Sequence, residues 1–301
     1  MTKEEVLKSL DSEDASKRRE AWFNLRTLLN LITKDDAKEI LKFLTYQDEE
    51  TRYNAWSYVP MFLDKGLFTL DEVKERKDYF LTLLESKDEV IRSQAWDIVN
   101  DLLNKGVLTV NEVGERKSFF FTLLEAKDEN IRFEAWKNVT GFIEKGVLTV
   151  KEVKDRIEYF LPLLEMEDVF KRDNMWSLLD TLIQKGVIDR EESKLFIKML
   201  GSNRTYRIVW YKMDLLIGKG IITKEEAKEI LKLLEAEDEK IRDETWNNLG
   251  ILVGRGLIGK EDSKFFIKLL SLPDEMAWEN FGSLVQMGII TKEDARELIK
   301  L

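Results

Sequence analysis

The chain has 301 residues, of which 44% are hydrophobic and 35% are charged, and its formal net charge at pH 7 is −10. It contains neither cysteine nor histidine, which excludes disulfides, thiolate metal sites and catalysis by Ser-His-Asp or Cys-His groups. The acidic balance favours solubility and argues against general binding to nucleic acid.

Two-helix units repeat along the chain, and tryptophan marks their register. All eight tryptophans occupy one recurring position, with spacings of 34, 40, 40, 40, 34, 36 and 32 residues: Trp22, Trp56, Trp96, Trp136, Trp176, Trp210, Trp246 and Trp278. A glycine follows ten residues later at Gly66, Gly106, Gly146, Gly186, Gly220, Gly256 and Gly288. A rare residue confined to one position of such a period indicates stacked repeats. We name the helix with the tryptophan the A helix and the helix after the glycine the B helix.

In chain order the expected elements alternate, and the chain opens and closes on a B helix. B helices are expected from about residues 2, 33, 69, 109, 149, 189, 223, 259 and 291, and A helices from about 14, 48, 88, 128, 168, 202, 238 and 274. Terminal B helices would cap the exposed ends of the stack. We therefore predict one domain over 1–301, with a half-repeat cap at 1–12, longer repeats mainly at 48–188 and shorter repeats mainly at 189–301.

Each repeat carries signals that start and stop its helices. Asp88 stands where an A helix needs an N-cap, and Gly106 is able to adopt the left-handed conformation that ends it. Thr109 and Glu112 then match a capping box for the B helix. The box recurs at Thr69…Glu72, Thr149…Glu152 and Thr223…Glu226, with looser copies at Asp189…Glu192 and Thr291…Asp294.

The repeats are of two lengths. B helices of repeats 2 to 4 are about four residues longer than those of repeats 1 and 6. Four residues is close to one helical turn of ~3.6 residues, so we expect an added turn that keeps the apolar stripe in register. Pro60 and Pro162 fall inside an A helix and a B helix, respectively. Each proline removes a backbone hydrogen bond, so we expect both helices to be kinked there.

A further signature, Asp-Glu-x-Ile-Arg-x-x-Ala-Trp, is clear at Asp88…Trp96 and Asp128…Trp136 and nearly complete at Asp238…Trp246. It resembles the HEAT/armadillo superfamily of helical repeats. The tryptophan and the glutamate after the aspartate depart from that family's pattern, which indicates a distinct subfamily. The resemblance implies B helices on the concave face and an Asp–Arg ladder between adjacent repeats. We predict an all-α fold, a right-handed α-α superhelix (solenoid) of about eight two-helix HEAT-like repeats with about 17 helices.

The tryptophan column has two interpretations. Each ring lies at the edge of an apolar stripe, so the favoured interpretation is packing against the next repeat. The alternative is a row of exposed rings that stack on bases or grip peptides.

A basic column recurs on the shorter B helices. Its members include Lys194, Lys198, Lys228, Lys232, Lys264 and Lys268. Like charges four residues apart cost a helix roughly 0.2–0.5 kcal/mol per pair, and an acidic column lies one residue further on. We favour Lys–Glu ladders between neighbouring B helices. The alternative is a cationic groove for phosphates or for an acidic protein surface.

The repeat pattern breaks between residues 169 and 212, where basic and aromatic residues replace the acidic start of an A helix. Departures from a repeat consensus are where a specific site is expected, and the competing interpretation is a repacked joint between long and short repeats. The predicted partner-binding patch comprises Phe170, Arg204, Tyr206, Arg207 and Tyr211.

The favoured function is a non-enzymatic scaffold that binds a protein or peptide partner along its curved surface, with no cofactor and no metal. The alternative is a nucleic-acid-binding protein, since the resemblance extends to DNA alkylation-repair glycosylases with HEAT-like repeats. The resemblance also extends to pigment-attachment lyases, but no residue of this sequence specifically supports that function. Buried tryptophans and Lys–Glu ladders would favour the scaffold, and exposed rings on a basic face would favour nucleic acid.

Residues 1–10 are charged, unlike a signal peptide. No apolar run approaches the ~18 residues of a membrane span. We therefore expect a cytoplasmic protein, and the abundance of Lys and Glu suits a thermophile.

Overall fold

The computed structural model describes residues 2–202, 204–271, 275–291, 293–294 and 296. These residues form helices joined by turns, and no strand occurs among them, as the all-α prediction requires. The chain divides into two compact units, Met1–Leu163 (unit 1) and Leu164–Leu301 (unit 2). Within the described ranges, no helix is long and apolar enough to cross a membrane.

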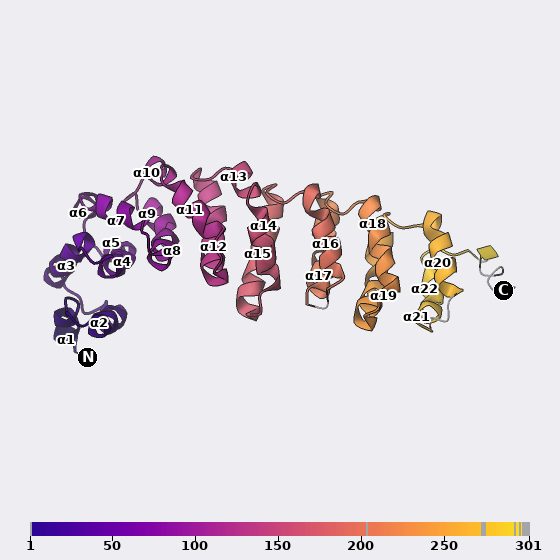
Figure 1. Cartoon of the computed structure of the whole chain (residues 1–301), viewed down its shortest axis with the longest axis horizontal. Coiled ribbons are helices and arrows are strands. Elements are labelled where there is room, and N and C mark those ends of the chain that lie inside the picture. Colours follow the sequence, from indigo (N-terminus) through magenta and orange to yellow (C-terminus); the bar gives the residue numbers. More distant parts are fainter. Residues whose placement is uncertain (1, 203, 272–274, 292, 295, 297–301) are drawn as a thin grey trace. The chain divides into compact units, whose positions relative to one another are not determined.

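Unit 1 alternates A and B helices along the chain (Figure 1). Its A helices are α2 (Ala15–Leu28), α4 (Glu49–Ser57) with α5 (Val59–Asp64), α8 (Glu89–Asp97) with α9 (Val99–Asn104), and α12 (Glu129–Lys145). Its B helices are α1 (Lys3–Ser9), α3 (Lys34–Leu41) with the 3₁₀ helix η1 (Lys42–Thr45), α6 (Leu70–Lys74) with α7 (Lys77–Leu83), α10 (Val110–Gly114) with α11 (Lys117–Leu124), and α13 (Val150–Lys154) with α14 (Ile157–Phe160). The 3₁₀ helix η2 (Leu161–Glu165) follows α14 and contains the boundary between the two units.

Unit 2 continues the alternation. Its A helices are α15 (Val169–Gln184), α17 (Tyr206–Gly218), α19 (Glu239–Gly254), and α21 (Glu275–Glu279) with α22 (Phe281–Gln286). Its B helices are η3 (Arg190–Glu192) with α16 (Ser193–Leu200), α18 (Lys224–Leu231) with η4 (Lys232–Glu235), and η5 (Lys260–Asp262) with α20 (Ser263–Leu270). The expected start of the last A helix at 274 and most of the last B helix lie outside the described residues.

The helices of each unit form two layers. A helices pack on A helices of adjacent repeats, as α8 does on α4 and α12, and as α17 does on α19. B helices pack in the same way, as α16 does on α18, and A helices also pack on B helices, as α17 does on α16. The α-helices thus bury apolar residues against neighbouring helices, which is how a repeat array builds a continuous core.

The predicted helix boundaries are confirmed where they depend on capping. Asp48, Asp88, Asp128, Asp168 and Asp238 each cap an A helix by accepting hydrogen bonds from its first backbone N–H groups. The capping boxes predicted at Thr69, Thr109, Thr149, Thr223 and Asp189 are present. All seven glycines ten residues after a tryptophan have positive φ, between 63° and 76°, so local chemistry sets these turns.

The longer B helices do not contain the continuous added turn that we predicted. They break into two helices at Arg76, Arg116 and Arg156. The Arg76 guanidinium donates to the Glu72 carbonyl oxygen at 2.6 Å, and the Arg76 backbone N–H bonds the Val73 carbonyl instead. The side chain therefore takes the acceptor that a continuing helix would use. Such splits are why the structure has more helices than the ~17 predicted from the repeat period.

Proline is not the main cause of the A-helix break near residue 60. The chain turns at Tyr58, between α4 and α5, where Pro60 lies in the first turn of the second helix. The same turn recurs at Ile98, between α8 and α9, although Asn100 stands where the earlier repeat has Pro60. At Pro162 the B helix becomes the 3₁₀ helix η2, as η1 and η4 do without proline.

The tryptophan column is structural. Seven of the eight rings are buried, and Trp278 is 47% exposed. The indole N–H groups of Trp56, Trp96, Trp136 and Trp176 donate to the carbonyl oxygens twelve residues earlier, at 2.9–3.2 Å. Those carbonyls belong to the last turn of the preceding B helix, where backbone acceptors lack helical partners. Each of these four tryptophans therefore packs between helices and also caps one of them, whereas the buried indole nitrogens of Trp22 and Trp246 have no such partner among the described residues.

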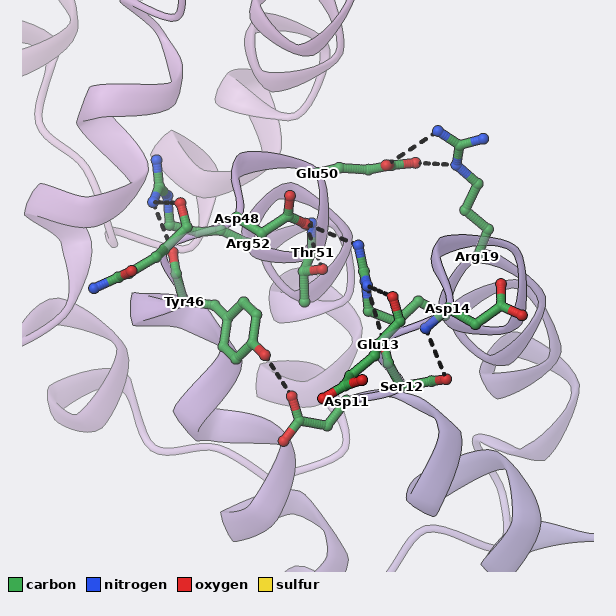
Figure 2. Close-up of polar contacts among 12 residues, drawn as sticks. Asp11, Ser12, Glu13, Asp14, Arg19, Tyr46, Asp48, Glu50, Thr51 and Arg52 are labelled. Carbon is green, nitrogen blue, oxygen red and sulfur yellow. Dashed lines mark hydrogen bonds and ion pairs between the residues drawn. The ribbon is translucent and has the colours of Figure 1, made fainter.

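The arginine of the signature caps the same helix end. Arg52, Arg92, Arg132 and Arg172 donate to carbonyl oxygens six residues earlier, at 2.6–3.1 Å. The ladder implied by the family resemblance is replaced there by this local contact. Arg18 does reach Asp48 of the next repeat, at 3.7 Å. Figure 2 shows further contacts between these repeats, including Arg19 with Glu50 and the Tyr46 hydroxyl with Asp11.

Candidate functional site

In α15 and in the next repeat, three exposed positions face away from the core and form what we call the outer stripe. They lie six and three residues before the tryptophan and one residue after it, a spacing that places them on one side of a helix. In α15 the outer stripe comprises Phe170, Asp173 and Ser177. In the next repeat it comprises Arg204, in the turn before α17, and Arg207 and Tyr211 on α17. Four of the five residues of the predicted patch therefore belong to two consecutive outer stripes.

These four side chains reach solvent. Phe170 is 77% exposed and Tyr211 is 83% exposed. The guanidinium groups of Arg204 and Arg207 are also exposed and make only long ion pairs, at 4.0 Å to Glu167 and 3.7 Å to Glu244. A repacked joint would bury the two rings, so the exposure favours a binding surface over the joint interpretation.

Tyr206 does not belong to the patch, and its prediction as a contact residue was wrong. The side chain is only 6% exposed. It lies four residues before Trp210 and therefore on the same, inward side of α17. We call Phe170, Arg204, Arg207 and Tyr211 the aromatic–arginine patch.

Lys212 lies beside this patch, with its charge already paired. Its ammonium group lies 5.4 Å from the centroid of the Tyr211 ring and 2.5 Å from an Asp180 carboxylate oxygen. Lys212 belongs to the irregular segment found in the sequence, but only the structure shows that its ammonium group lies near the Tyr211 ring.

The basic column is exposed and partly paired. Lys194, Lys198, Lys228, Lys232, Lys264 and Lys268 are all exposed. Lys232 pairs with Glu229 at 2.6 Å, and Lys268 pairs with Glu235 of the preceding B helix at 3.2 Å. Within the described part of the chain, no ion pair within 4.0 Å is formed by the other four lysines, Lys194, Lys198, Lys228 and Lys264.

The predicted ladder between B helices is present at their first turns. Arg190 pairs with Glu225 at 2.5 Å, and Lys224 pairs with Glu261 at 3.2 Å. Carboxylates are thus interleaved with the cations of this face. Together with seven buried tryptophans, this arrangement gives the nucleic-acid alternative no support.

Sequence reasoning missed a pocket in unit 1. It has a volume of about 380 Å³ and is lined by residues of α4, α8 and α12, among them Ser93. The available signal was the position three residues before the tryptophan, which is aromatic in the neighbouring repeats at Tyr53 and Phe133 but serine here.

Comparisons with known proteins do not assign the chain to a family. No family model matches. An uncharacterized protein in the sor 5′ region of Acidianus ambivalens is 34% identical over 86 residues, which are 27% of this chain and 37% of that relative. The aligned part thus spans well under half of the relative's length.

Solved structures match the chain only at low similarity. A chain of a homology model of the full-length AP-3 complex gives a TM-score of 0.46 at 14% identity, over 98% of this chain and 52% of that one. The CpcE–CpcF complex of phycocyanin lyase from Nostoc gives 0.34 at 16% identity, over 83% and 87%. Kap121p bound to Pho4p gives 0.34 at 11% identity, over 99% and 43%. At these values the likenesses establish no shared activity, and the comparisons assign the chain to no family.

Proposed function

We propose that this chain is a non-enzymatic HEAT-like scaffold that binds a protein partner through the outer stripes of these two repeats, at the aromatic–arginine patch. The observation that carries the proposal is the exposure of Phe170 and Tyr211, at 77% and 83%, on consecutive A helices. Binding is favoured when a partner covers large aromatic side chains that are otherwise exposed to water, because the burial of apolar surface lowers the free energy. Tyrosine and arginine are also the residues that most often dominate binding energy at protein interfaces.

The charges around the rings indicate the chemistry of the partner. Arg204 and Arg207 keep most of their donors available, because their ion pairs are long and solvent-exposed. Lys212, beside Tyr211, already pairs with Asp180, so the two arginines supply the available positive charge. The patch therefore suits a peptide segment of the partner that has an apolar side chain flanked by carboxylates. Attraction between those carboxylates and the arginines also accelerates association at low salt.

The absence of catalysis is part of the proposal. Three carboxylates that approach one another, Asp189, Glu191 and Glu192, occur at the start of a B helix. Asp189 and Glu192 there form a capping box, so we assign this cluster a structural role. We further expect the protein to act in the cytoplasm.

Capture of the partner from extract of the source organism tests the function. The bait is the tagged full chain, used on nuclease-treated and untreated halves of one extract, beside the double variant Phe170→Ala/Tyr211→Ala. Asn247→Ala is the matched control, because Asn247 occupies the position of Tyr211 in the following repeat.

We expect one discrete protein in both halves with the wild type and with Asn247→Ala, and at least a tenfold lower yield with the double variant. Retention of that protein by the double variant would refute the patch. Loss of all captured material after nuclease treatment would refute the protein-scaffold assignment itself.

A further inference from the structure

The pocket in unit 1 is lined by residues of three consecutive A helices. Tyr53 comes from α4, and the other lining residues come from α8 and from the start of α12. The full lining comprises Tyr53, Val90, Ser93, Gln94, Asp97, Asp128, Asn130, Ile131 and Glu134. Its volume of about 380 Å³ is at the lower end of ligand sites, which span roughly 300–1,000 Å³. The space therefore suits one long side chain better than a large ligand.

A small residue at one repeat position creates this space. The residues three before the tryptophan are Tyr53, Ser93 and Phe133 in successive A helices. Phe133 is buried, and Tyr53 is partly buried. Ser93 has only a hydroxymethyl group at this repeat position. The volume that an aromatic ring fills in the flanking repeats is therefore open between α8 and α12.

The pocket presents negative charge. Asp97, Asp128 and Glu134 contribute carboxylates, and no lysine or arginine belongs to the lining. The Asn138 amide donates to Asp97 Oδ1 at 3.0 Å and orients that carboxylate. Asp128 is held by the backbone N–H groups of α12 that it caps, whereas Glu134 already pairs with Lys137 at 2.5 Å. Asp97 is therefore the carboxylate best placed to receive a new cation.

Two hydroxyl groups in the pocket also lack partners. Ser93 is 7% exposed, and neither its hydroxyl nor that of Tyr53 has a hydrogen-bond partner within residues 2–202. Burial, and after it the charge of Asp97, raises the pKa of Tyr53 to about 12. The phenol is therefore protonated at neutral pH and available as a donor or acceptor. Both hydroxyls line the pocket, so they are able to hydrogen-bond a polar ligand that enters it.

We propose that this pocket binds a basic side chain, arginine or lysine, of a protein partner. Val90 and Ile131 cover the alkyl stem, and Asp97 receives the cationic head, with the Tyr53 and Ser93 hydroxyls beside it. Such charge-assisted hydrogen bonds are the stronger kind. The pocket belongs to unit 1 and the aromatic–arginine patch to unit 2, so neither proposal depends on the other.

The test uses the ¹⁵N-labelled full chain and a defined probe, N-acetyl-arginine methylamide. Its binding is followed by amide chemical shifts in a titration. The matching compound N-acetyl-citrulline methylamide has nearly the same shape without the charge. We expect saturable shifts at Gln94, Asn130 and Ile131 with the arginine compound, and at least a tenfold higher Kd for the citrulline compound.

Variants assign the effect to the pocket. Asp97→Asn is expected to raise Kd at least tenfold, and Ser93→Phe, which restores the ring of the flanking repeats, to abolish the shifts. Asp101→Asn is the control, since Asp101 is an exposed carboxylate on α9 outside the lining.

Equal binding of the citrulline compound, an unchanged Kd in Asp97→Asn, or shifts spread over all acidic surfaces would each overturn the proposal. Circular dichroism reports whether Ser93→Phe folds, and Asp97→Asn decides the question if it does not. Because these variants leave Phe170 and Tyr211 intact, failure here is distinguishable from failure of the proposed patch.

Discussion

Trp56→Phe tests whether the tryptophan column stabilises the fold by hydrogen bonding as well as by packing. The Trp56 indole N–H donates to the Leu44 carbonyl oxygen at 2.9 Å in a buried setting. Phenylalanine keeps an aromatic ring but leaves that carbonyl without a partner. The matched control is Trp22→Phe, because Trp22 is also buried in unit 1 and its indole nitrogen has no hydrogen-bond partner among the described residues.

The two sites have similar packing. Trp56 lies 5.1 Å from Phe80 and Trp22 lies 5.4 Å from Phe43, between ring centroids. The smaller ring costs each variant about 2 kcal/mol, at ~0.8 kcal/mol for each buried carbon-sized group. An unpaired buried carbonyl costs Trp56→Phe about 1–3 kcal/mol more. We therefore expect about 3–5 kcal/mol of destabilisation for Trp56→Phe and about 2 kcal/mol or less for Trp22→Phe.

Urea unfolding followed by far-UV circular dichroism measures this difference in the free energy of unfolding. Repeat arrays lose cooperativity when one repeat is weakened, so amide hydrogen exchange in α4 and α2 gives the local values. Equal destabilisation by the two variants, within about 0.5 kcal/mol, would show that the indole hydrogen bond adds no net stability. The column would then act by packing alone.

Three further outcomes follow from the helix boundaries. Gly146→Ala, at φ +76°, is expected to lower the free energy of unfolding by about 1–2 kcal/mol, whereas Gly114→Ala in α10 raises it by up to about 1 kcal/mol; a chemical melt of each variant checks this. The side-chain and backbone hydrogen bonds of Thr69 lower the pKa of Glu72 below 4.5. The stability contributed by this carboxylate is therefore present above pH 4.5 and is lost as the pH falls through the lowered value. When the pH is lowered from neutral to acidic, the melting temperature of Glu72→Gln is expected to fall less than that of the wild type. An equal fall in both proteins would contradict the capping role of Glu72. Pro60→Ala is expected to leave the helix break in place, because the next A helix breaks there without proline; backbone chemical shifts would reveal a continuous helix if this is wrong.

Local chemistry determined most of the secondary structure from the sequence alone. The Asp88 N-cap, the Thr109 capping box and the left-handed turn at Gly106 depend on residues within a few positions of one another. Period and apolar spacing likewise predicted the two-helix repeat and the buried face of Trp96. The number of repeats, the right-handed twist and the continuity of one domain stay predictions.

Tertiary structure decided what depends on neighbouring helices. The split of the longer B helices required the Arg76 side chain to take a backbone acceptor, which no periodicity shows. Tyr206 and Tyr211 are both aromatic residues in one irregular segment, yet only one is exposed, because the turn at the start of α17 fixes which side meets the core. The pocket at Ser93 depends on three helices meeting around one small side chain. Sequence patterns report the face of a single helix, whereas packing between helices determines which volumes are filled and which remain open to a partner.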